Sequence, residues 1–200
     1  MKTKTINVYS YAELSDKAKE RAWLDSLQHF EYAWADDNAA SLKGFENTFP
    51  LKIKHWEYGG RGEGVNFEMT CDDAVTLLTG QRLATYIWNN FRNDIYKGKF
   101  YSTSGNYVDG KYSYKSRHSK IILESSCPFT GYCMDDALLD EVFAFMEKPD
   151  SRNFEELMGD CFEAWVKACN DDADYQSSQP AFAESCEANE YEFDESGDML

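Results

Sequence analysis

Four adjacent pairs of aspartates are the side chains in this sequence best suited to chemistry, at 36–37, 72–73, 135–136 and 171–172. Paired carboxylates can hold a divalent cation or act as acid and base. The pairs at 72–73 and 135–136 precede helical patterns, where carboxylates cap N–H groups and face the positive end of the helix dipole. The last pair follows a predicted helix, where negative charge is mildly unfavourable. Solubility or partner binding therefore explains it better than helix stability.

Histidine and cysteine form no recognisable catalytic or metal-binding motif. His29, His55 and His118 lie in no nucleophile elbow and no known cysteine motif. Cys127 and Cys133 are separated by five residues, whereas structural zinc ligands are usually separated by two to four. We therefore predict a protein that is not an enzyme and that uses no cofactor and no metal. A small metal-dependent enzyme, built from the aspartate pairs with His118 or the cysteines, is an alternative.

The six cysteines are expected to be reduced thiols; they lie at 71, 127, 133, 161, 169 and 186. In a secreted protein they could form three disulfides. However, residues 1–6 lack the apolar core that is typical of a signal peptide, and no apolar run approaches the ~18 residues of a membrane span. These features predict a cytoplasmic protein without membrane association.

Four glycines fall within six positions in the segment 59–64, Gly-Gly-Arg-Gly-Glu-Gly. A phosphate-binding loop follows a strand and leads into a helix N-terminus, where backbone N–H groups face the anion. Here residues 51–58 and 65–70 alternate as two strands, and no Lys-Ser or Lys-Thr follows the glycines. The segment is therefore predicted to be a hairpin loop.

The remaining patterns predict an α+β fold, with an antiparallel sheet and helices packed on one face. A first helix is expected from about Ser15 to Phe30, and it continues or restarts through Asn47. Further helices are expected from 72–73 to Phe91 and from 135–136 to Pro149. The last is expected over 154–169, where apolar residues recur at steps of three and four. Residues 5–10 are expected to form a first strand and 99–125 two or three strands with turns at Gly105-Asn106 and Asp109-Gly110. We expect one α+β domain over 1–170 and an acidic C-terminal segment over 171–200, which could pack as an edge strand.

Charge is unevenly distributed along the chain. Residues 1–134 contain 17 Lys and Arg against 16 Asp and Glu, whereas residues 135–200 contain 3 against 20. The last third therefore carries a net charge of -17 and accounts for the negative charge of the whole chain. A function must explain this asymmetry.

The segment 82–120 combines basic and aromatic residues and suggests a second alternative. It holds eight Lys and Arg against Asp94 and Asp109, interleaved with Phe91, Tyr96, Phe100, Tyr101, Tyr107, Tyr112 and Tyr114. Aromatic side chains beside a basic groove can stack the bases of single strands. A single-stranded nucleic-acid-binding accessory protein is therefore possible, although the acidic third would repel the phosphate backbone. A tyrosine-rich sheet with solvated lysines explains the same pattern.

Three short patches resemble a loosely defined, uncharacterised group of small acidic proteins encoded by bacteriophages and prophages. The patches are Leu14-Ser15-Asp16-Lys17-Ala18-Lys19 after Tyr11, the loop Gly60-Arg61-Gly62-Glu63-Gly64-Val65, and Ala188-Asn189-Glu190-Tyr191-Glu192-Phe193. Together they cover about 20 residues. In the loop, Gly60 and Arg61 stand where the group has Ser and Gln. The resemblance implies a phage origin and supplies no catalytic residues.

The acidic third and this resemblance together predict a phage-type, non-enzymatic inhibitor. Small acidic phage proteins often block host nucleic-acid enzymes or defence complexes, such as a CRISPR effector, by presenting carboxylates where phosphates would bind. The expected partner is a host protein complex with a basic groove; direct nucleic-acid binding is less favoured. A solvated acidic surface without a partner explains the same composition. The residues expected to bind the partner are Asp171, Asp172, Asp174, Glu187, Glu190, Glu192, Asp194 and Glu195.

Overall fold

The computed structural model describes residues 7–60, 62–96, 102–108, 111–118, 127–132 and 134–200, with the backbone alone for 102–108 and 111–118. The chain divides into two compact units. Unit 1 combines Met1–Trp34 with Cys169–Leu200, and unit 2 is Ala35–Ala168. This division differs from the predicted 1–170 and 171–200, because the C-terminal segment packs with the first 34 residues instead of forming a separate appendage.

Two helices and a short ladder build unit 1. Helix α1 (Asp16–Leu27) begins at Ser15, whose side chain accepts a hydrogen bond from the Ala18 N–H. Helix α7 (Gln179–Ala188) begins at Ser178, which caps Ala181 in the same way. The sequence analysis missed α7, although Ser178 followed by a proline in the first turn is a typical helix start. Strand β1 (Tyr9–Ser10) pairs antiparallel with β6 (Glu192–Phe193), so the predicted edge strand is two residues long.

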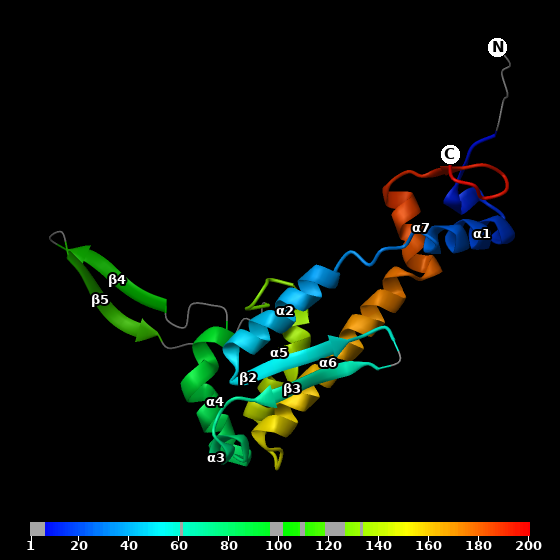
Figure 1. Cartoon of the computed structure of the whole chain (residues 1–200). Helices are drawn as coiled ribbons and strands as arrows, with labels where there is room; N and C mark the ends of the chain where they lie inside the picture. The colour runs from blue at the N-terminus through cyan, green and yellow to red at the C-terminus, as the bar shows by residue number, and fades with distance from the viewer. Residues whose placement is uncertain (1–6, 61, 97–101, 109–110, 119–126, 133) are drawn as a thin grey trace. The chain divides into compact units, whose positions relative to one another are not determined.

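The core of unit 1 joins residues from both ends of the sequence. Its buried members are Tyr11, Leu14, Ala18, Ala22, Cys186 and Phe193. Tyr11 lies in a short 3-10 helix, η1 (Tyr11–Glu13). Close to this core, Gly197 has φ +90°, and a Cβ at this position would lie 2.4 Å from the Ala18 carbonyl oxygen. Glycine is therefore required where the C-terminal loop passes over α1 (Figure 1).

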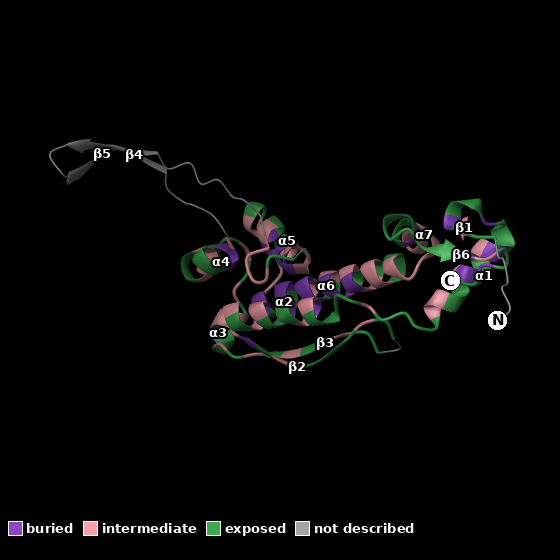
Figure 2. Cartoon of the chain, turned by 90° about the horizontal axis from the view of Figure 1, so that it is seen from above, coloured by how far each residue is buried: buried purple, intermediate pink, exposed green. Residues whose placement is uncertain are grey.

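The first part of α6 (Phe154–Gln176) belongs to the core of unit 2, and its residues from Cys169 onward belong to unit 1. The apolar face predicted for this helix is confirmed, because Phe154, Leu157, Met158, Cys161, Phe162, Trp165 and Val166 are all at most 8% exposed. Helices α2 (Ala35–Thr48) and α5 (Met134–Glu147) complete the core, and Figure 2 shows their buried residues alongside those of α6. The predicted helix 73–91 is instead two helices, α3 (Asp73–Thr76) and α4 (Gly80–Ile95), because Gly80 has φ +53° and interrupts the helical backbone.

The glycine-rich segment joins β2 (Leu51–Glu57) to β3 (Gly64–Met69), which pair antiparallel, so the predicted hairpin is confirmed. Gly59, at φ +78°, supplies the left-handed conformation in the loop. Helices of unit 2 pack against this hairpin, since Phe67 contacts Phe162 of α6 and Lys52 pairs with Glu46 of α2.

The α+β class is confirmed, although the described strands form three separate two-stranded ladders and not one continuous sheet. The third ladder pairs β4 (Ser102–Val108) with β5 (Lys111–His118). The turn predicted at Gly105-Asn106 is wrong: both residues lie within β4, where the register shifts between Ser104 and Gly105. The turn at Asp109-Gly110 and the strand predicted at 120–123 lie outside the described residues.

Candidate acidic partner-binding site

A groove in unit 1 is the candidate functional site. It encloses about 900 Å³ between residues 8–13 and residues 183–192. Its apolar lining is made by Val8, Tyr9, Tyr11, Ala183, Cys186 and Tyr191. Among the described residues, its carboxylates are Glu13, Glu184, Glu187, Glu190 and Glu192, against the cation Lys19. The groove therefore combines apolar surface with a strong excess of negative charge.

The end of α7 positions three of these carboxylates. The Tyr191 N–H donates to the Cys186 carbonyl oxygen at 3.0 Å, which closes the helix end. Glu190, at φ +54°, then turns the chain into β6, whose pairing with β1 places Glu192 opposite Ser10. Glu187 lies in the last turn of α7, which contains no basic residue. Negative charge is unfavourable at a helix C-terminus, so helix stability does not explain Glu187.

The groove carboxylates differ in what they already contact. Glu13 accepts the Ser10 N–H and the Ser10 hydroxyl, both at 2.8 Å, and these bonds lower the pKa of Glu13. Glu184 accepts a hydrogen bond at 3.1 Å from Tyr175, whose pKa is thereby raised. Glu187, Glu190 and Glu192 are exposed and form no ion pair with the described residues. These three carboxylates are the ones free to bind a cationic partner.

Two of the eight residues predicted to bind a partner accept hydrogen bonds within unit 1. The Asp172 carboxylate accepts hydrogen bonds from the Tyr32 hydroxyl and from Gln176 Nε2. The Asp194 carboxylate accepts the N–H groups of Ser196 and Asp198 at 2.9 and 3.1 Å, and its pKa is lowered, chiefly by the hydrogen bond from the Ser196 hydroxyl. Both side chains are therefore engaged within the fold.

The structure brings only Glu187, Glu190 and Glu192 of the predicted set to the groove. Asp171 and Asp174 lie on the last turns of α6, and Glu195 lines a separate hollow with Asn7 and Ser196. The sequence analysis missed Glu13 and Glu184. Glu13 could have been recognised from the capping-box spacing Ser10-Tyr11-Ala12-Glu13, which the structure confirms. Glu184 had no such signal, because its place depends on how α7 packs.

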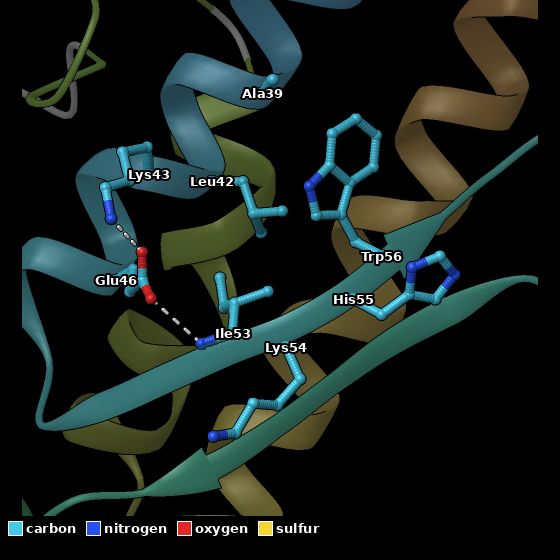
Figure 3. A pocket seen from close by; sticks show the side chains of 8 residues that line it. All are labelled: Ala39, Leu42, Lys43, Glu46, Ile53, Lys54, His55 and Trp56. Atoms are coloured by element: carbon cyan, nitrogen blue, oxygen red, sulfur yellow. Dashed lines mark hydrogen bonds and ion pairs between the residues drawn. The ribbon is translucent and has the colours of Figure 1, made fainter.

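A second hollow, of about 310 Å³, lies between α2 and β2 in unit 2. Figure 3 shows the Trp56 indole beside Leu42, and Glu46 between Lys43 and the Ile53 backbone N–H. Glu46 accepts from this N–H at 3.1 Å and also pairs with Lys52 at 2.9 Å, outside the hollow. The carboxylate that lines this hollow is thus already bonded, which favours the unit 1 groove as the binding site.

Glu46 makes a pH-dependent contribution to stability. Its hydrogen bond from Lys43 is the main reason that its pKa falls from 4.5 to about 2. A carboxyl group with a lowered pKa stabilises the folded state above its unfolded pKa, and this contribution is lost as the pH falls through the folded value. Because Lys43 and Lys52 are 59% and 54% exposed, the contribution is about 1–2 kcal/mol. Glu46→Gln should lower the free energy of unfolding by this amount at pH 7 and weaken its pH dependence between about pH 4.5 and pH 2.

Urea unfolding at a series of pH values measures this effect. Glu68→Gln is the matched control, because the Glu68–Lys54 pair joins side chains that are 56% and 49% exposed. That control should change the free energy of unfolding by less than about 0.5 kcal/mol. An unchanged pH slope in Glu46→Gln would show that the lowered pKa does not stabilise the fold.

Part of the basic and aromatic segment 82–120 contributes to packing in unit 2. Phe91 contacts Phe49 and Phe154 at ring-centroid distances of 5.0 and 6.3 Å, and Tyr96 stacks on Phe143 at 5.0 Å. Phe91 and Tyr96 are therefore packing residues and poor platforms for stacking bases. Residues 97–120 of the segment have their side chains outside the described residues, so nucleic-acid binding by the segment stays a prediction.

The described cysteines and acidic groups show no arrangement for metal binding. No group of three or more His, Cys, Asp or Glu side chains is placed to hold a metal ion in the described part of the chain. Burial raises the pKa of the Cys169 thiol to about 12 and that of Cys186 to about 11, so both thiols are poor nucleophiles at neutral pH. No described helix has the length and apolarity needed to cross a membrane.

Comparison of the chain with protein-family models, with curated proteins and with solved structures finds no match.

Proposed function

We propose that this chain is a non-enzymatic binding protein whose unit 1 engages the cationic groove of a partner protein. The observation that carries the proposal is the groove in which Glu187, Glu190 and Glu192 lie exposed and without ion pairs among the described residues. Carboxylates held on a folded surface can form ion pairs with Lys and Arg side chains that otherwise bind phosphates. The expected partner is therefore a protein that handles nucleic acid.

The charge of unit 1 supports this proposal. Residues 169–200 contribute ten Asp and Glu with no Lys or Arg, while residues 1–34 contribute five of each kind. Unit 1 therefore has a net charge of -10 within a chain of -16. Such a surface attracts a basic partner over a distance set by the ionic strength, about 8 Å at physiological salt. It also disfavours direct binding of DNA or RNA by the same unit.

An anti-defence inhibitor is the narrower form of this proposal. A phage protein that covers the basic groove of a host nucleic-acid-handling complex, for example a CRISPR effector, would act by charge and steric occlusion without catalysis. The resemblance of the three short patches to phage-encoded proteins motivates this form. The narrower role predicts that the captured partner is a component of such a complex.

Neutralising the exposed carboxylates of unit 1 is expected to abolish partner binding. The variant combines Asp174→Asn, Glu187→Gln, Glu190→Gln, Glu192→Gln and Glu195→Gln, and leaves Asp172 and Asp194 to stabilise the fold. Each exposed charge pair contributes about 0.2–1 kcal/mol, so the loss of five, about 1–5 kcal/mol in sum, should weaken binding by about fivefold to a few thousandfold. The tagged chain is used for capture from bacterial lysate at low salt, with and without nuclease, and the partner is identified by mass spectrometry.

A charge-matched variant in unit 2 controls for net charge. It combines Asp72→Asn, Asp94→Asn, Asp140→Asn, Glu147→Gln and Glu163→Gln, all at exposed positions. Capture by this variant should resemble that by the wild type and should weaken steeply with added salt. Salt-independent capture, equal for both variants and the wild type, would refute the proposal. Capture that is lost after nuclease treatment would instead favour the nucleic-acid-binding alternative.

A further inference from the structure

We infer that the unit 1 groove binds a short peptide rich in lysine or arginine. This inference rests on the proposed function and names the part of the partner that enters the groove. The inference concerns the carboxylates that line the groove. Asp174 and Glu195 carry the same charge on unit 1 but do not line the groove, so they should contribute little to peptide binding.

The shape and apolar lining of the groove fit this occupant. A volume of about 900 Å³ falls in the range of ligand pockets, ~300–1,000 Å³. Val8 and Tyr191 line the groove yet are 48% and 38% exposed. Lys and Arg side chains can cover such surface with their aliphatic stems while their charged ends stay at a polar rim. The tyrosine ring also offers a face for a cation.

Charge selects the peptide against other occupants. Five carboxylates face the groove against one cation, Lys19. An anionic ligand would be repelled, and an entirely apolar helix would cover Glu187, Glu190 and Glu192 without supplying partners for them. A basic peptide supplies both the cations and the apolar stems. A small polyamine supplies the charge alone and covers less of Val8 and Tyr191.

The test measures binding of a fluorescent, terminally blocked peptide of alternating arginine and alanine to the full chain by anisotropy at low salt. The groove variant is Glu190→Gln with Glu192→Gln. The control is Asp174→Asn with Glu195→Gln, which has the same charge change on the same unit. The groove variant should weaken binding about tenfold and the control less than about twofold. Backbone amide shifts in the wild-type NMR spectrum should change at residues 183–192, and circular dichroism shows that both variants fold.

Several results would overturn the inference. Equal losses in the two variants would show diffuse attraction to unit 1. No binding at low salt, or equal competition by spermidine at the same concentration, would exclude a peptide-specific groove. None of these results removes the proposed function, which fails separately if the five-carboxylate variant still captures its partner from lysate.

Discussion

Replacing Asp135 by alanine is expected to lower the free energy of unfolding by about 3–5 kcal/mol, because several hydrogen-bond donors lose their buried acceptor and each unsatisfied donor costs about 1–3 kcal/mol. Asp135 is 0% exposed. Its carboxylate accepts the N–H groups of Phe129 at 2.8 Å, Thr130 at 2.7 Å and Gly131 at 3.3 Å, and the Thr130 hydroxyl at 3.0 Å. It thereby joins the loop at 127–131 to the first turn of α5.

The effect should extend beyond this loop, because Thr130 is also hydrogen-bonded to Ser41 on α2 at 3.2 Å. Phe129, in the same loop, packs edge-on against Phe45. The neighbouring Asp136→Asn is the matched control, since the Asp136 carboxylate, in the same first turn, accepts hydrogen bonds from Cys127 alone among the described residues, at 3.3 and 3.6 Å. The control should cost less than about 1 kcal/mol in urea unfolding. Similar midpoints for the two variants would show that the buried carboxylate contributes no more than an ordinary helix cap.

Replacing Phe193 by alanine is expected to destabilise unit 1 by about 3–4 kcal/mol and to abolish peptide binding in the groove. Phe193 is 1% exposed, and the centroid of its ring lies 5.9 Å from that of the Tyr11 ring. Its truncation would leave a cavity in the small core that holds η1, α1, α7 and β6 together. Because this core positions both sides of the groove, binding should fail even though no carboxylate is changed.

Tyr191→Ala is the matched control for the change in stability, whereas peptide binding is compared with the wild type because Tyr191 itself lines the groove. Tyr191 lies two residues before Phe193 and is 38% exposed, so its truncation should cost less than about 1 kcal/mol in stability. Hydrogen exchange followed by NMR measures the amides of unit 1 and unit 2 separately in both variants. Unchanged protection of unit 1 amides in Phe193→Ala would show that the β1–β6 ladder and the helices do not depend on this ring.

Local patterns in the sequence were sufficient to predict several elements. The apolar face of α6, the helix start at Ser15 and the β2–β3 hairpin depend on residues within a few positions of one another, and each is as predicted. The acidic composition of the last third is likewise a property of the sequence. For this reason the α+β class and an acidic candidate region could be inferred before the structure was known.

The tertiary structure decided which segments share a core and which carboxylates share a groove. Residues 1–34 and 169–200 pack into one unit, a pairing that no local period indicates because an apolar face can pack on any complementary surface. The same packing brings Asp172 within hydrogen-bonding distance of Tyr32 and leaves Glu187, Glu190 and Glu192 around the groove, whereas Asp194 accepts hydrogen bonds from its own loop. Charge is thus determined by the sequence, whereas its availability to a partner depends on which polar groups the fold brings within hydrogen-bonding distance.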